Sequence, residues 1–122
     1  MEFITNIDID NIRKAAIGQG SCATGIAMLL HGKERFIETN KMLEQDDPTA
    51  HAAIVITRSK RGLVRKDKSV ELLLNEKPCP MCICAISQTN INGLYYLNNN
   101  RIDFIELHSD NIDCWYEEIK SK

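Results

Sequence analysis

The order in which short apolar runs and helix-forming segments follow one another constrains the fold of this chain most strongly. Strands are predicted at residues 26–30, 35–39, 70–74, 93–97 and 102–107. Helices are predicted at residues 7–17, 47–59, 81–89 and 110–119. Strands that alternate with helices in this way are typical of the α/β class.

The connections between these segments indicate how the strands pair. The segment His31-Gly32-Lys33-Glu34 has the composition of a tight turn, so the first two strands should form an antiparallel hairpin. The later strands are joined through helices and should run parallel. We therefore predict a three-layer α/β/α sandwich with a mixed five-stranded sheet. A length of 122 residues suits a single domain that spans residues 1–122.

Composition excludes several classes of protein. Hydrophobic residues make up 43% of the chain and charged residues 26%, which supports a packed core rather than global disorder. No apolar run approaches the roughly 20 residues that cross a bilayer, and Met1–Thr5 shows no secretory signal. We expect a cytoplasmic protein with no membrane partner. The net charge of −2 argues against a uniformly basic nucleic-acid coat protein.

The chain has five cysteines, and an odd number without an export signal does not favour a disulfide framework. Clustered cysteines are then better explained by metal binding or catalysis. Cys22 and Cys114 are isolated and are expected to pack as small hydrophobic residues. Cys84 lies two residues beyond Cys82, so we expect it to point away from any ligand-bearing face and into the core.

The segment Pro78-Cys79-Pro80-Met81-Cys82 carries the strongest chemical signal. Pro80 suits the first position of a helix, which makes Cys79 its N-cap and Cys82 its third residue. Residues three apart share a helix face, and a helix N-terminus favours thiolates. The spacing alone fits a two-ligand zinc clip, a redox pair or plain burial.

His51 favours the metal among these alternatives. Asp47 suits a helix N-cap and Pro48 the first helical position, so His51 should lie in the first turn of a helix. Two helix N-termini at one edge of a sheet can converge. One imidazole and two thiolates would leave the fourth position of a tetrahedral zinc ion open to water, which is the pattern of catalytic sites.

The segments Asp47-Pro48-Thr49-Ala50-His51-Ala52 and Pro78-Cys79-Pro80-Met81-Cys82 together resemble the cytidine deaminase-like superfamily. Within it, the chain is most similar to the branch that holds guanine deaminases and tRNA adenosine deaminases. The spacings of Gly25, Asn40 and Asp47 also match this branch, so the resemblance covers residues 25–97.

The resemblance implies a zinc site and a pocket for a base. His51, Cys79 and Cys82 would bind Zn²⁺, and Asn40 would hydrogen-bond the substrate base. The amide of Ala52 and the backbone of Pro78 and Cys79 would line the pocket beside the metal. Members of this superfamily are commonly dimers, so the resemblance also implies a homodimer.

The chain departs from the family at residue 53. The family has a glutamate two residues after the histidine, and this glutamate carries protons during the reaction. Here the position is Ala53, which has no titratable group. We expect the chain to bind zinc and substrate but to turn over poorly or not at all. Either the glutamate was replaced deliberately, or the chain is a naturally non-catalytic zinc-binding or partner protein.

The resemblance implies hydrolytic deamination of a nucleobase, and the expected substrate is a small molecule, a guanine-type or related purine base. The alternative is adenosine in tRNA. Lys77 stands where the family frequently has a glutamate, directly before the Pro-Cys pair. This difference weakens the inference that the chain shares its substrate with particular members of the family.

A basic segment bears on the choice of substrate. Residues 58–68 hold six basic residues and one acid, which leaves 9 basic and 16 acidic residues elsewhere. The part of this segment from Lys60 to Lys68 is predicted to be a linker between a helix and a strand. It is either a solvated loop or a surface that contacts the phosphates of a nucleic acid.

Overall fold

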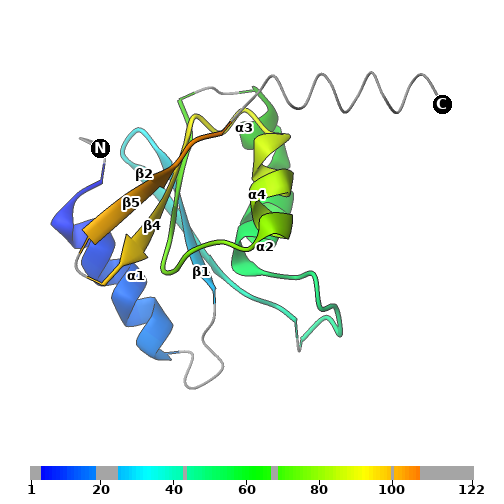
Figure 1. Cartoon of the computed structure of the whole chain (residues 1–122), viewed down its shortest axis with the longest axis horizontal. Coiled ribbons are helices and arrows are strands. Elements are labelled where there is room, and N and C mark those ends of the chain that lie inside the picture. Colours follow the sequence, from blue (N-terminus) through cyan, green and yellow to red (C-terminus); the bar gives the residue numbers. More distant parts are fainter. Residues whose placement is uncertain (1–3, 19–24, 43, 67–68, 100, 108–122) are drawn as a thin grey trace.

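The fold is built on one mixed sheet (Figure 1). The computed structural model describes residues 4–18, 25–42, 44–66, 69–99 and 101–107. The strands are β1 (Ile26–His31), β2 (Glu34–Thr39), β3 (Glu71–Leu74), β4 (Gly93–Asn98) and β5 (Arg101–Ile105). They lie in the order β2-β1-β3-β4-β5, with β3 and β4 parallel and the other neighbours antiparallel.

Helices cover both faces of this sheet, so the predicted three-layer α/β/α sandwich with five strands is confirmed (Figure 1). One face packs against α1 (Asn6–Gly18). The opposite face packs against α2 (Ala52–Ser59), α3 (Arg61–Lys66) and α4 (Pro80–Ser87). None of the described helices is long and apolar enough to cross a membrane.

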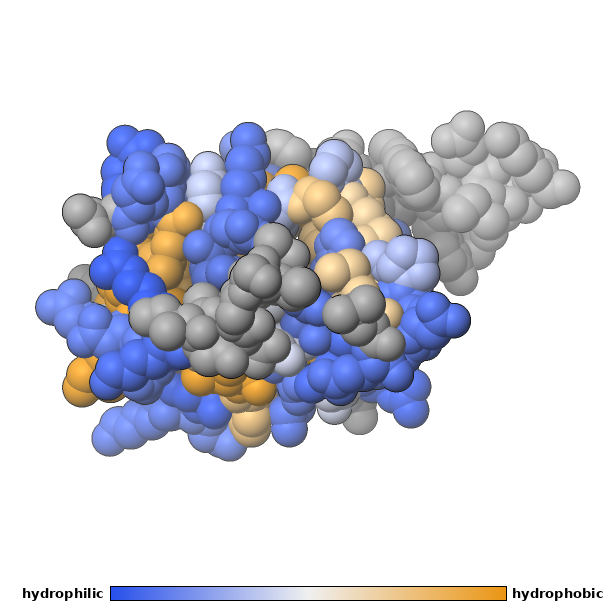
Figure 2. Space-filling model, turned by 90° about the horizontal axis from the view of Figure 1, so that it is seen from below, coloured by the Kyte–Doolittle hydropathy of each residue, from blue (hydrophilic) through white to orange (hydrophobic). Residues whose placement is uncertain are grey.

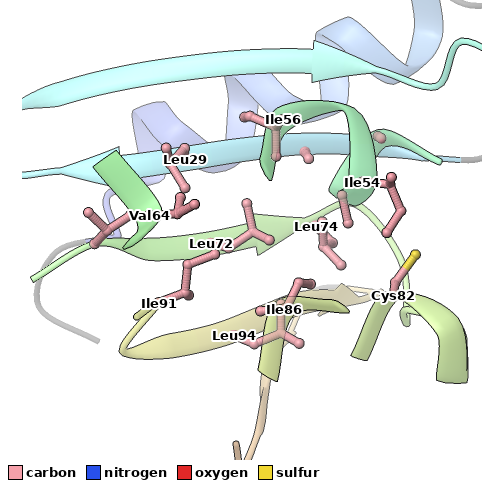
Figure 3. Close-up of a cluster of buried hydrophobic side chains, with 14 residues drawn as sticks. Leu29, Ile54, Ile56, Val64, Leu72, Leu74, Cys82, Ile86, Ile91 and Leu94 are labelled. Carbon is pink, nitrogen blue, oxygen red and sulfur yellow. The ribbon is translucent and has the colours of Figure 1, made fainter. Parts of the chain in front are cut away.

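The hydrophobic core consists of two clusters, because successive side chains of each strand point to opposite faces of the sheet. In β3, Leu72 and Leu74 point toward α2 and α4, whereas Leu73 points toward α1. Figure 3 shows the larger cluster, where Ile56 of α2 and Ile86 of α4 meet the strands and are fully buried. At about 25 cal/mol per Å² of apolar surface, this burial is the main force that holds the helical layer to the sheet.

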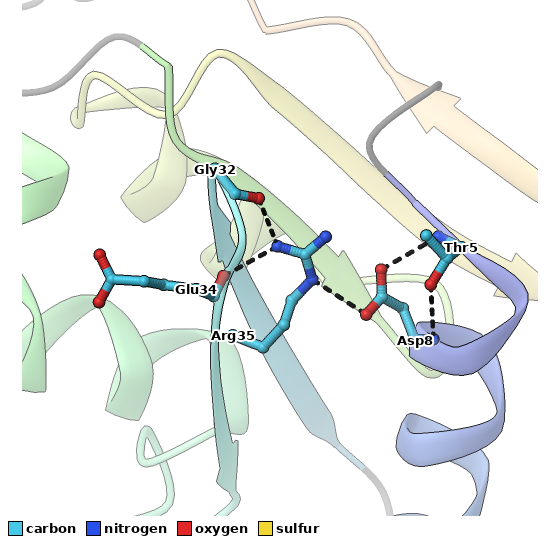
Figure 4. A network of polar contacts seen from close by, with 5 residues as sticks. All are labelled: Thr5, Asp8, Gly32, Glu34 and Arg35. Carbon is cyan, nitrogen blue, oxygen red and sulfur yellow. Dashed lines mark hydrogen bonds and ion pairs between the residues drawn. The ribbon is translucent and has the colours of Figure 1, made fainter.

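The start of α1 is fixed to the hairpin by a polar network that the sequence did not predict (Figure 4). Thr5 and Asp8 form a capping box, in which each backbone N–H donates to the other's side chain, at 3.0 and 3.2 Å. The Arg35 Nε of β2 donates to Asp8 Oδ1 at 2.9 Å. Burial raises the pKa of Asp8, but the hydrogen bonds from Arg35 and Thr5 outweigh it and lower the pKa below 3.8.

Most predicted elements are confirmed, but the helix predicted at residues 47–59 begins later. It starts at Ala52, and residues 47–51 form turns instead. Asp47 Oδ1 accepts hydrogen bonds from the Thr49 N–H at 2.9 Å and from the Thr49 hydroxyl at 2.7 Å. This local bonding competes with the helix, so His51 is the N-cap of α2 and does not lie in its first turn.

Two other predictions were wrong in part. The segment 60–68 is not simply a linker, because it contains α3, whose Val64 is 1% exposed in the core. β5 pairs antiparallel with β4 because a short turn joins them, with Asn99 at a φ of 59°. The helix predicted at residues 110–119 lies outside the described residues.

The described surface is mostly hydrophilic, as Figure 2 shows for the face seen from below. Its large exposed hydrophobic side chains are scattered over different elements. They are Ile7, Ile37, Met81 and Phe104.

Candidate metal centre

Two helix N-termini meet at one edge of the sheet and bring three side chains together. His51 is the N-cap of α2 and Cys79 is the N-cap of α4. An N-cap side chain usually accepts a hydrogen bond from its own helix, but the His51 side chain does not. Both side chains instead turn toward each other and toward Cys82, the third residue of α4.

The three potential ligand atoms form a nearly equilateral triangle. The His51 Nδ1 lies 3.5 Å from Cys79 Sγ and 3.4 Å from Cys82 Sγ, and the two sulfurs are 3.6 Å apart. A tetrahedral zinc ion with bonds of about 2.3 Å to sulfur and about 2.05 Å to nitrogen places sulfur and nitrogen about 3.6 Å apart and two sulfurs about 3.8 Å apart. The group therefore has the donor set and the spacing for zinc.

The loop between β3 and α4 is held in place by a side chain that the sequence did not single out. Asn75 directly follows β3, and its Oδ1 accepts a hydrogen bond from the Ile26 N–H at 2.8 Å. The Asn75 N–H donates to the Ile26 carbonyl at 3.1 Å. These bonds pin the loop that carries Cys79 to the start of β1. An asparagine after an apolar strand is a common turn residue, so its position in the sequence is a weak signal of this function.

The two thiols differ in their tendency to ionise. Burial raises the pKa of Cys79, but hydrogen bonds from the backbone and side chain of Cys82 and from the backbone of Met81 outweigh burial and lower it. Burial raises the pKa of Cys82 to about 12, and the neighbouring Cys79 adds to this increase. Cys79 therefore ionises more readily than Cys82, and a bound divalent cation would stabilise the thiolate form of both.

A pocket of about 140 Å³ opens beside these three residues. A cavity of about 150 Å³ takes up one benzene-sized ring, so this pocket has room for a group of that order. Three residues predicted to lie beside the substrate, Ala52, Pro78 and Cys79, line it, and so does Ala53, the position of the family's glutamate. Glu76 and Lys77 also line it and contribute its charged groups, and the sequence did not assign either residue to the pocket.

Asn40 does not itself line the pocket but adjoins it through Gly25. The Asn40 N–H donates to the Gly25 carbonyl at 3.1 Å, and Gly25 is a lining residue. Gly25 has a φ of 108°, which strongly favours glycine. The function of Asn40 as a contact to the base stays a prediction.

Ala53 is the second residue of α2, is 3% exposed and lines the pocket with the three metal-binding candidates. A side chain at this position faces the pocket from the first turn of the helix. The methyl group of alanine can neither accept nor deliver a proton there.

Cys84 points away from the metal centre as predicted, but the prediction that it packs into the core was wrong. Its side chain is exposed on α4, because the helix turns this position away from both the metal centre and the sheet. Cys22 and Cys114 lie outside the described residues.

Comparison with known proteins finds tRNA deaminases among the similar proteins. No family model matches the chain. The chain is 32% identical over 74 residues to a tRNA-specific adenosine deaminase of Agrobacterium fabrum (strain C58 / ATCC 33970). The match covers 59% of this chain, which spans about half (49%) of the length of that relative.

A solved structure from a study of A-to-I editing by tRNA:A34 deaminases at the wobble position of transfer RNA has the same architecture. It superposes with a TM-score of 0.55 and 30% sequence identity, over 70% of this chain and 66% of that one. The fold is that of the cytidine deaminase-like superfamily. The two sequence motifs resemble those of this superfamily, and the structure brings the His51, Cys79 and Cys82 of these motifs together in the same fold.

Proposed function

We propose that this chain is a zinc-dependent hydrolytic deaminase domain that acts on adenosine in tRNA, in a form that lacks its main proton carrier. The observation that carries the proposal is the His51, Cys79 and Cys82 triangle beside a pocket of about 140 Å³. Both relatives are described as tRNA deaminases, which favours this substrate over the guanine-type free base expected from the sequence.

The residues of the chain supply binding and orientation. His51, Cys79 and Cys82 would hold the metal, which when bound activates water for attack on the ring carbon that carries the amine. The Ala52 backbone, Pro78 and the Cys79 backbone line the wall beside the metal, where the reacting ring would lie. Asn40, placed next to Gly25, would hydrogen-bond the base. In the overall reaction, water replaces the amine and ammonia leaves.

Ala53 interrupts this reaction at its proton transfers. General acid–base catalysis typically contributes about 10²–10⁴-fold, and one glutamate would serve several transfers. Because residue 53 faces the pocket from the first turn of α2, a carboxylate there would reach the space beside the metal. We infer that substrate binding persists in this chain while turnover is greatly reduced.

The experiment restores the carboxylate. Zinc-loaded Ala53→Glu is compared with Ala53→Gln, which has nearly the same shape but no titratable group. Ammonia release and inosine formation in tRNA are measured, with zinc content as a second measurement. We expect Ala53→Glu alone to gain at least about 100-fold in rate. Equal rates for the two variants at full zinc occupancy would contradict the proposal, and activity on guanine alone would contradict its substrate.

A second candidate function is a non-catalytic zinc-binding or partner protein, which Ala53 itself favours. This candidate predicts that Ala53→Glu binds zinc fully and yet releases no ammonia from tRNA, nucleosides or free bases. The homodimer expected from the family resemblance stays a prediction, which light scattering of the purified chain would test.

A further inference from the structure

A group of exposed arginines lies on the helical layer away from the pocket. We define the basic surface as Arg58 at the end of α2 and Arg61 and Arg65 on α3, all three of which are exposed. Arg61 and Arg65 are four residues apart and therefore share one face of α3. We propose that this basic surface binds the phosphate backbone of a folded RNA whose target base occupies the pocket, an inference that rests on the proposed function.

The arginines are largely available for an external anion. Arg58 pairs with Asp47 at 3.8 Å, but the two side chains are 61% and 33% exposed, so this pair contributes little. Within the described part of the chain, neither Arg61 nor Arg65 has an acidic partner. A surface that carries unpaired guanidinium groups attracts phosphates, to which arginine binds with two parallel hydrogen bonds.

The structure also holds α3 in a fixed position. Val64 is 1% exposed in the core, so the opposite face of this short helix must point outward. Asn90 closes the helix, since its N–H donates to the Val64 carbonyl at 2.7 Å and its side-chain amide donates to the Arg65 carbonyl. Next to α3, the Lys60 ammonium lies 4.3 Å from the centre of the Phe36 ring. The arginines are thus presented from an ordered element.

The distance between the basic surface and the pocket favours a folded RNA over a free base as the partner. α2 has eight residues and begins beside His51, so at 1.5 Å per residue its length separates the pocket from α3 by about 12 Å. Figure 1 shows α3 at the far end of the helical layer from the start of α2. A free base held in the pocket cannot span this distance. A folded RNA can, and it would present several phosphates to the basic surface.

Charge variants test the proposal, with binding of fluorescently labelled, unfractionated tRNA measured at several salt concentrations. The double variant Arg61→Glu with Arg65→Glu should weaken tRNA binding about tenfold or more. The slope of the logarithm of the binding constant against the logarithm of the salt concentration should also become shallower, by about 0.7–0.9 for each phosphate that the variant no longer neutralises. The matched control is Lys14→Glu with Lys33→Glu, which changes the net charge equally at exposed positions on α1 and at the hairpin turn. The control should change binding by less than about twofold.

Several outcomes would overturn the proposal. They are unchanged tRNA binding by the arginine variant, equal weakening in the lysine control, and arginine-dependent binding to anionic lipid vesicles without binding to tRNA. If the glutamates impair folding, Arg61→Gln with Arg65→Gln should still weaken binding while zinc content is retained. Failure of the proposed function is distinguishable, because it would appear as inactivity of Ala53→Glu whether or not tRNA binds through the arginines.

Discussion

The Nδ1 of His51 lies 3.5 Å from the Sγ of Cys79, although the two residues are 28 positions apart in sequence. Each residue is the N-cap of its own helix, so the contact joins the starts of α2 and α4. A cation held between them would bridge two elements that otherwise meet only through packing. The stability of the helical layer should therefore depend on the metal.

Removal of the metal should destabilise the protein. We expect a chelator to lower the melting temperature of the zinc-loaded protein, and we expect Cys82→Ser to bind zinc much more weakly than the parent. Cys84→Ser is the matched control, because Cys84 is on the same helix but exposed. Thermal unfolding with and without chelator measures both effects. An unchanged melting temperature on chelation would contradict a metal that bridges the two helices.

Gly25 should tolerate substitution poorly. Its φ of 108° is strained for any other residue, although an added Cβ would make only an ordinary van der Waals contact, 3.5 Å from the Ala52 Cβ. We expect Gly25→Ala to lower the free energy of unfolding by about 1–2 kcal/mol. Gly62→Ala is the control, because a Cβ there meets nothing within 4 Å and α3 gains helix propensity. Denaturant unfolding should separate the two, and equal losses would refute this explanation.

Gly93 should be required for a different reason. A Cβ there would lie 2.8 Å from Glu71 Oε2 and 2.8 Å from Tyr95 Cε2, both on buried side chains. We expect Gly93→Ala to cost about 1–3 kcal/mol of unfolding free energy through overpacking. The cost should fall when Glu71→Ala is introduced first, and a double-mutant cycle measures this coupling. Additive losses would show that Glu71 is not the residue that resists the added methyl group.

The Asp8–Arg35 ion pair should make stability depend on acidity. Hydrogen bonds lower the pKa of Asp8 in the folded state. The ionised carboxylate therefore contributes its full share to the free energy of unfolding above the unfolded-state pKa of about 3.9. This share is lost as the pH falls through the lower pKa of the folded state. We expect Asp8→Asn to reduce the slope of stability against pH in this acidic range. Asp10→Asn is the control, since Asp10 is exposed on the same helix. Urea unfolding between neutral and acidic pH makes the comparison, and identical slopes for the two variants would be inconsistent with this pairing.

The sequence predicted the strands, the first hairpin and the Cys79 N-cap well, because each depends on local signals: apolar alternation, turn residues and a proline at the first helical position. It placed His51 inside a helix because Asp47-Pro48 is a helix-start signal, whereas the Asp47–Thr49 hydrogen bonds favour a turn. Asn75 and the Arg35–Asp8 pair were not predicted, because their partners are distant in sequence. Cys84 was misplaced because exposure depends on which neighbours pack against α4.

X-ray absorption spectroscopy of the zinc-loaded protein tests the central claim most directly. A metal held by His51, Cys79 and Cys82 should show two sulfur ligands at about 2.3 Å, one imidazole nitrogen at about 2.0 Å and one further light-atom ligand from solvent. A shell of three or four sulfurs, or a spectrum without an imidazole contribution, would contradict the account.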